Sequence, residues 1–198
     1  MSSDTPTTSF IFPKREDCVY TQCYCEENIW HLAKSILESN KSVKDLKCYV
    51  VALSNSNKCV HLWKQTMKEN DYRDGLIFWD YHVFCVVKHK NQTWVFDMDS
   101  KLPFPVSFAQ YDKEAVRHDF PDIKRYFKII DAQTYIDTFS SDRNHMLKGG
   151  VWLSPPPTYP PILNKEKQSN LENIISMEDP LDKFGEVLNL ENFKAKFY

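Results

Sequence analysis

The chain has 198 residues, which corresponds to one domain at about 150 residues per domain. Aromatic residues make up 14% of it and charged residues 26%, and 25 basic residues nearly balance 27 acidic ones, for a net charge of -2. This composition excludes general disorder, and the near-neutral charge gives no indication of nucleic-acid binding.

Sequence motifs exclude several common enzyme classes. The four glycines never stand in Gly-x-Gly spacing, so the Rossmann fingerprint, the P-loop and the Gly-x-Ser-x-Gly elbow are absent, as is His-Glu-x-x-His. No uncharged apolar run approaches the roughly 18 residues of a membrane span, and no secretory signal is visible. Six cysteines without such a signal indicate a reducing compartment and free thiols. We therefore expect a soluble, cytoplasmic protein, with the nucleus as a second location.

The first predicted element is a helix. Residues 1–12 are rich in Ser and Thr at their start and are expected to form a disordered tail, with a single domain over 13–198. From 26 to 38 apolar residues recur at the spacing of an amphipathic helix, namely Ile29, Leu32, Ala33, Ile36 and Leu37. Glu26 and Glu27 occupy its first turn, where the helix dipole favours carboxylates. Cys25 lies at the N-terminal end of this helix.

Strands dominate the next part of the chain. Alternating and β-branched runs separated by turn residues predict two hairpins, 48–53 with 59–63 and 76–88 with 93–98. The second has a two-residue turn at Lys90 and Asn91. A further strand is expected over 127–130, followed by a short helix that begins near Asp131. A helix followed by a mostly antiparallel sheet predicts an α+β fold.

The C-terminal part carries a proline-rich segment and a closing helix. Prolines 155–157 and 160–161 are typical of an extended polyproline segment, which we interpret as a strap on the surface rather than as an SH3-type ligand. After Asn189, a helix N-cap, the apolar positions Leu190, Phe193 and Phe197 predict an amphipathic helix.

Cys25 is the candidate nucleophile. A thiolate is the reactive form of cysteine, and the N-terminus of a helix stabilises negative charge on sulfur. Cys23 lies outside the helix and lacks this advantage. The cysteines Cys18, Cys23 and Cys25 do not have the paired spacing of a zinc site, so neither zinc nor another cofactor is expected.

A nucleophilic thiol needs a base, and the base needs an orienting group. His82 lies inside the predicted strand 76–88, and strand alternation puts Asp80 on the same face. The hairpin register sets His82 opposite either Asp97 or Asp99, and alternation alone does not choose between them. Of the other histidines, His145 in a polar loop remains a candidate base. A surface ion pair is the alternative interpretation of the His-Asp pairing, but aromatic residues surround the position.

These motifs resemble those of the eukaryotic protein N-terminal glutamine amidohydrolases. The strings that carry the resemblance run in the same order from about Pro13 to Tyr198, namely Cys23-Tyr24-Cys25-Glu26-Glu27-Asn28-Ile29-Trp30, Trp79-Asp80-Tyr81-His82-Val83, Phe96-Asp97-Met98-Asp99, Leu102-Pro103-Phe104-Pro105, Ser141-Asp142-Arg143-Asn144-His145-Met146 and Pro155-Pro156-Pro157-Thr158-Tyr159-Pro160. Ser100 stands where the family often carries Thr. The segments 55–58 and 164–169 show no match.

The resemblance implies a single catalytic domain with a fold similar to papain-like enzymes and transglutaminases, and a triad of Cys25, His82 and Asp97. It further implies deamidation of N-terminal Gln to Glu with release of ammonia, in protein and peptide substrates that feed the Arg/N-degron pathway. We expect a monomer that needs no metal and binds neither nucleic acid nor membrane. A papain-like protease or transglutaminase with the same triad is the alternative, and a noncatalytic module built on the proline segment is a second one.

Recognition of a chain terminus requires a partner for the substrate's α-ammonium group. A carboxylate near the triad suits this role, and Glu27 and Asp80 are the two candidates from the sequence. Helix capping is the competing interpretation of Glu27.

Overall fold

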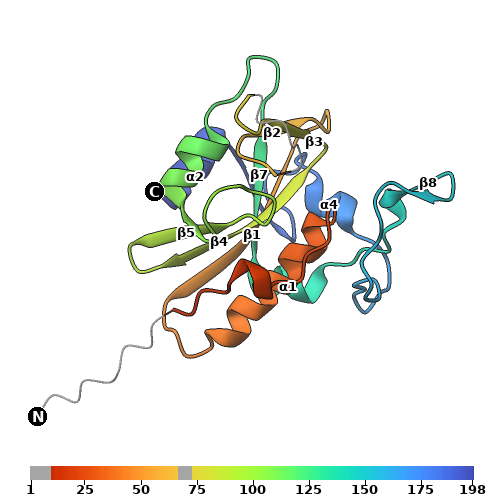
Figure 1. Cartoon of the computed structure of the whole chain (residues 1–198), viewed down its shortest axis with the longest axis horizontal. Coiled ribbons are helices and arrows are strands. Elements are labelled where there is room, and N and C mark those ends of the chain that lie inside the picture. Colours follow the sequence, from red (N-terminus) through yellow and green to blue (C-terminus); the bar gives the residue numbers. More distant parts are fainter. Residues whose placement is uncertain (1–9, 67–72) are drawn as a thin grey trace, which may run out of the picture.

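An antiparallel sheet forms the centre of the molecule (Figure 1). The computed structural model describes residues 10–66 and 73–198, and in these residues the sheet has six strands in the order β10-β7-β1-β4-β5-β6. These strands are β1 Leu46–Ser54, β4 His82–His89, β5 Gln92–Phe96, β6 Val106–Ser107, β7 Tyr126–Asp131 and β10 Gly185–Asn189. Two small pairs accompany them, β2 Val60–Leu62 with β3 Ile77–Trp79 and β8 Leu147–Lys148 with β9 Val151–Trp152.

Helices cover both faces of the sheet. They are α1 Cys25–Ser39, α2 Phe108–Tyr111, α3 Ala132–Thr138, α4 Leu171–Ile175 and α5 Leu190–Phe197, with the short helical turns η1 Arg15–Asp17, η2 Asp112–Val116 and η3 Asn144–Met146. Strand alternation gives the sheet two apolar faces. One face packs against α1, α3 and α4, and the other packs against α2 and the closing helix α5. The fold is α+β with a mostly antiparallel sheet, and none of the described helices is long and apolar enough to cross a membrane.

The predicted helices and the second hairpin are confirmed within a few residues. The helix expected over 26–38 is α1, and the closing helix begins as α5 directly after Asn189, whose side chain accepts a hydrogen bond from the Asn192 N–H. In the second hairpin His89 pairs with Gln92, so the two-residue turn falls at Lys90 and Asn91 as expected.

The prediction of a hairpin between 48–53 and 59–63 is wrong. The strand β1 lies inside the sheet, and its two edges pair with β4 and β7. With both edges occupied, β1 has no hydrogen-bonding edge left for the following strand. That strand, β2, pairs with β3 instead.

The prediction of one strand over 76–88 is also wrong, because the chain changes sheets within it. Residues 77–79 pair with β2, whereas residues from His82 onward pair with β1. Asp80 lies at the break, where its carboxylate accepts a hydrogen bond from the Tyr81 N–H at 2.9 Å. Strand alternation therefore does not place Asp80 on the sheet face of His82.

The start of the described chain and the proline segment both pack against other parts of the domain. Of the expected tail, residues 1–9 lie outside the described residues, whereas residues 10–12 are placed and pack against the sheet, with Phe10 and Phe12 in ring contact with Trp94. The proline segment is a strap, as expected, because Arg143 donates hydrogen bonds to the carbonyls of Pro157 and Tyr159.

Candidate active site

Cys25 is the first residue of α1 and lies against the start of β4. The loop before it is fixed by Asn28, whose side chain accepts from the Thr21 N–H and donates to the Thr21 carbonyl, both at 2.8 Å. Cys25 is buried, with 8% of its surface exposed. The backbone of Val83 acts to lower the pKa of the Cys25 thiol, so Cys25 lies near the residue that directly follows His82.

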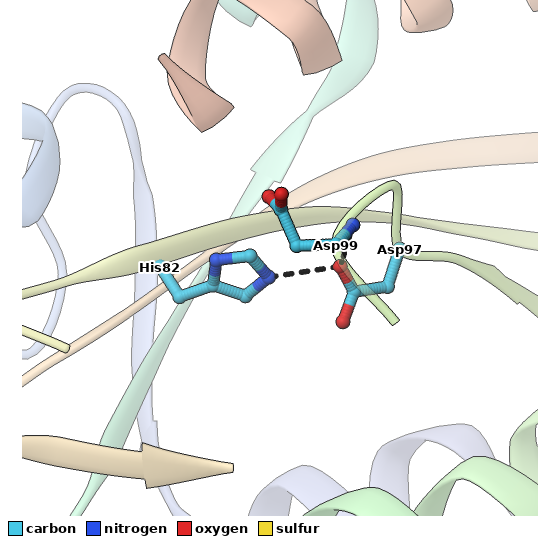
Figure 2. A group of neighbouring side chains, drawn as sticks. All are labelled: His82, Asp97 and Asp99. Carbon is cyan, nitrogen blue, oxygen red and sulfur yellow. Dashed lines mark hydrogen bonds and ion pairs between the residues drawn. The ribbon is translucent and has the colours of Figure 1, made fainter. Parts of the chain in front are cut away.

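His82 and Asp97 form a buried pair (Figure 2). The His82 Nε2 lies 2.9 Å from Asp97 Oδ1, and neither side chain is more than 1% exposed. The register of the hairpin would set Asp99 opposite His82, because Cys85 pairs with Phe96. The strand β5 ends at Phe96, however, and the turn that follows brings the Asp97 carboxylate to the imidazole instead.

Asp97 is held by further donors. Its Oδ2 accepts from the Tyr111 hydroxyl at 2.8 Å and from Gln65 Nε2 at 3.2 Å, and its Oδ1 also accepts from the Asp99 N–H. Burial alone would raise the pKa of Asp97, but His82 and these hydrogen bonds lower it below its ordinary value. The carboxylate is therefore both ionised and fixed in orientation.

His82 keeps one ring nitrogen available. Burial alone would lower the pKa of His82, but the Asp97 carboxylate raises it above the ordinary value. Among the described residues, Nδ1 is buried and has no hydrogen-bond partner. With Nε2 bonded to Asp97, Nδ1 is the nitrogen that can exchange a proton with a neighbouring group.

Asp99 occupies a different position from Asp97. Its Oδ1 accepts from the Tyr20 hydroxyl at 2.6 Å, and burial raises its pKa. Possible ligand atoms of His82, Asp97 and Asp99 all lie within 4.8 Å of one another, a separation that a metal ion could bridge. Of the two aspartates, only Asp97 is joined to the imidazole in Figure 2.

The surroundings of Cys25 oppose a thiolate. The pKa of Cys25 lies well above its ordinary value, mainly because of burial and then because of the Glu26 carboxylate. The sulfur lies 3.6 Å from Glu26 Oε2. A neighbouring negative charge disfavours a second one, and a thiol whose pKa is raised needs a base to become nucleophilic.

Sequence reasoning missed Glu26 as a site residue. Its carboxylate is fully buried, and it accepts a hydrogen bond from the Tyr81 hydroxyl at 3.0 Å. His145, the second candidate base, lies 3.4 Å from Glu26 Oε1 through its Nε2. A carboxylate in the first turn of a helix is expected on the surface, and nothing in the local sequence signals its burial.

Glu27 and Asp80, the two carboxylates that the sequence suggested for the α-ammonium group, lie in different surroundings. Both oxygens of Glu27 are bound by Arg143, with Nε and Nη2 at 2.8 and 2.7 Å. This bidentate pair is buried, so both Glu27 oxygens already have a charged partner, which argues against the substrate-binding role expected from the sequence. Asp80 is exposed, with one oxygen on the Tyr81 N–H.

We expect replacement of Arg143 to destabilise the fold strongly. Removing one member of a buried ion pair leaves the other charge buried and unpaired, so Arg143→Met should lower the free energy of unfolding by roughly 3–5 kcal/mol. The matched control is Lys58→Met, which breaks an exposed pair with Glu172 and should cost less than about 1 kcal/mol. Urea unfolding curves measure both, and equal losses would contradict a structural role for the Glu27–Arg143 pair.

A family model and several named relatives match nearly the whole chain. A family model described as N-terminal glutamine amidase matches residues 20–197. The chain is 42% identical over 197 residues to proteins of Drosophila melanogaster and Drosophila erecta, each named protein N-terminal glutamine amidohydrolase. The alignment covers 97% of this chain and 94% of each relative.

Proposed function

The chain belongs to the N-terminal glutamine amidase family, and from this premise we propose that it hydrolyses the side-chain amide of an N-terminal glutamine to give glutamate and ammonia. Its substrates are proteins and peptides that begin with Gln. We also propose that the glutamate formed feeds the Arg/N-degron pathway, that the protein acts as a cytoplasmic monomer, and that its fold is of the papain and transglutaminase kind.

We propose Cys25, His82 and Asp97 as the catalytic triad. The observation that carries this proposal is the buried hydrogen bond between His82 and Asp97, which leaves the other ring nitrogen without a partner among the described residues. Cys25 lies near the backbone of Val83, the residue that follows His82. A nucleophile, a base and an orienting group in this relation can perform acyl transfer.

The reaction proceeds in two steps under this proposal. His82 takes the thiol proton as the Cys25 sulfur attacks the side-chain carbonyl carbon, and the same proton then passes to the departing nitrogen, so that the C–N bond breaks and ammonia leaves. Water attacks the resulting thioester, with its proton taken by His82 and returned to the sulfur. The products are the glutamate carboxylate and the regenerated thiol.

The first turn of α1 suits the developing oxyanion. N–H groups in the first turn of a helix have no intrahelical partner, and the Tyr24 side chain at the N-cap does not cap them. The Cys25 N–H is therefore our proposed donor to the tetrahedral oxygen. Asp97 acts as the positioning residue that holds the imidazole in one tautomer.

Mass spectrometry of treated peptides tests this function. A peptide with N-terminal Gln should gain about one dalton without change in length, because NH2 is replaced by OH. A cysteine protease with the same triad would instead cleave an internal peptide bond, and a transglutaminase would join Gln to an amine. Either of these products in place of the one-dalton gain would overturn the proposal.

The pH profile of kcat/KM follows from the His82 environment. A protonated imidazole cannot accept the thiol proton, so activity should fall as pH decreases through the pKa of His82. Because Asp97 raises that pKa, the acid limb should lie above 6.5, the ordinary value for His. In Asp97→Asn the negative charge is lost and the limb should move to lower pH. Initial rates across pH 5–9 measure both, and an acid limb near pH 4 would show instead a preformed thiolate–imidazolium pair.

A further inference from the structure

The buried carboxylate of Glu26 has one oxygen without a hydrogen-bond donor. Glu26 Oε2 accepts from the Tyr81 hydroxyl, whereas Oε1 has no hydrogen-bond partner among the described residues. An ionised carboxylate can accept several hydrogen bonds, and burying one of its oxygens without a donor is costly. Among the described residues, the contact of Oε1 is the long ion pair with His145 Nε2 at 3.4 Å, so this oxygen lacks a short hydrogen bond.

The charged side chain beside Oε1 is that of His145. His145 Nε2 is the nearest charged partner at 3.4 Å, and its side chain, 21% exposed, is the solvent-facing member of the group. Burial alone would lower the pKa of His145, but Glu26 raises it above the ordinary value. Tyr81, whose hydroxyl contacts both Glu26 and His145, closes the group on the strand side.

Glu26 also lies at the right separation from the nucleophile. Its Oε2 is 3.6 Å from the Cys25 sulfur. In glutamine four single bonds join the side-chain carbonyl carbon to the amine nitrogen, so these atoms are at most about 5 Å apart. A carbonyl carbon placed at the sulfur thus leaves the amine within reach of the same carboxylate. In asparagine only three bonds separate the two groups.

We propose that the Glu26 carboxylate binds the α-ammonium group of the substrate. Cys25 then contacts the side-chain carbonyl and Glu26 the amine of the same N-terminal glutamine. This inference rests on the proposed function. Acetylated and internal glutamines offer no cation to Glu26. The α-ammonium also neutralises the charge that opposes a thiolate on Cys25, so binding of a chain terminus favours activation of the nucleophile.

A pair of peptides that differ only at the α-amine tests this assignment. One begins with Gln, and the other begins with the desamino analogue, a 4-carbamoylbutanoyl group, so that only the α-ammonium is missing. At pH 7 the wild-type protein should favour the Gln peptide in kcat/KM by about 100-fold or more, because its partner charge is buried. In Glu26→Gln the preference should fall below about fivefold. Glu38→Gln, the same exchange at an exposed position of α1, should keep the wild-type ratio.

The outcomes separate the two proposals. Retention of the full preference in Glu26→Gln, or its loss in Asp80→Asn instead, overturns the assignment of Glu26. If wild-type protein releases no ammonia from any Gln-terminal peptide, the proposed function itself fails. Should Glu26→Gln not fold, Glu26→Asp keeps the charge but withdraws it by one methylene, and the preference should then fall at least tenfold. An unchanged preference in that variant contradicts the assignment equally.

Discussion

Cys25→Ala should abolish ammonia release from a Gln-terminal peptide, with a loss of at least about 10⁴-fold in kcat. The change removes only the sulfur that attacks the substrate. Alanine favours helices and Cys25 begins α1, so the fold should remain intact. Ammonia release measures the loss, and circular dichroism establishes that the variant is folded.

Cys23→Ala is the matched control for the nucleophile. Cys23 lies two residues earlier, in the turn before α1, with a positive φ of 69° and a half-buried side chain. Burial also raises its pKa, and it has no place in the proposed proton path. Substantial activity should therefore remain. Loss of activity in Cys23→Ala together with its survival in Cys25→Ala would mean that the nucleophile is misassigned.

Asp97→Asn should lower kcat by roughly 10²–10⁴-fold. An amide in place of the carboxylate removes the negative charge that raises the pKa of His82, and its NH2 group favours the wrong imidazole tautomer. Tyr111 and Gln65 would remain as donors toward the same position, so the side chain should stay in place. Ammonia release under saturating substrate gives kcat.

Asp99→Asn provides the comparison for Asp97. Asp99 is buried nearby and accepts from the Tyr20 hydroxyl, but it makes no hydrogen bond to the imidazole. Its replacement should cost less than about tenfold in kcat, and the acid limb of the pH profile should move less than in Asp97→Asn. Equal losses in the two variants would contradict Asp97 as the orienting group.

Local periodicity made much of the fold predictable. The spacing of Ile29, Leu32 and Ile36 predicted α1, and the turn at Lys90 and Asn91 predicted the hairpin of β4 and β5, with two registers left open. Long-range pairing was not predictable, because nothing near residues 48–53 shows that β1 has both edges occupied by β4 and β7. The same limit applies to the change of sheets at Asp80.

The candidate site was also predictable only in part. The register brought His82 and two aspartates together, but the choice between them depends on where β5 ends and how the next turn directs Asp97. The contrast between Glu26 and Glu27 lies wholly in tertiary structure. Arg143, which forms the ion pair with Glu27, is 116 residues away along the chain. The sequence around two adjacent glutamates in one helical turn does not show which of them has such a partner.

Covalent labelling of the nucleophile tests the central claim most directly. A peptide whose first residue is the diazoketone analogue of glutamine keeps the side-chain carbonyl and places an alkylating carbon where the amide nitrogen would lie. We predict that it modifies Cys25 with loss of N2, that peptide mapping finds the adduct there and not on Cys23, and that the α-acetylated form of the same peptide labels far more slowly. An adduct on another residue, or equal labelling by the free and acetylated peptides, would contradict a Cys25-based N-terminal glutamine amidohydrolase.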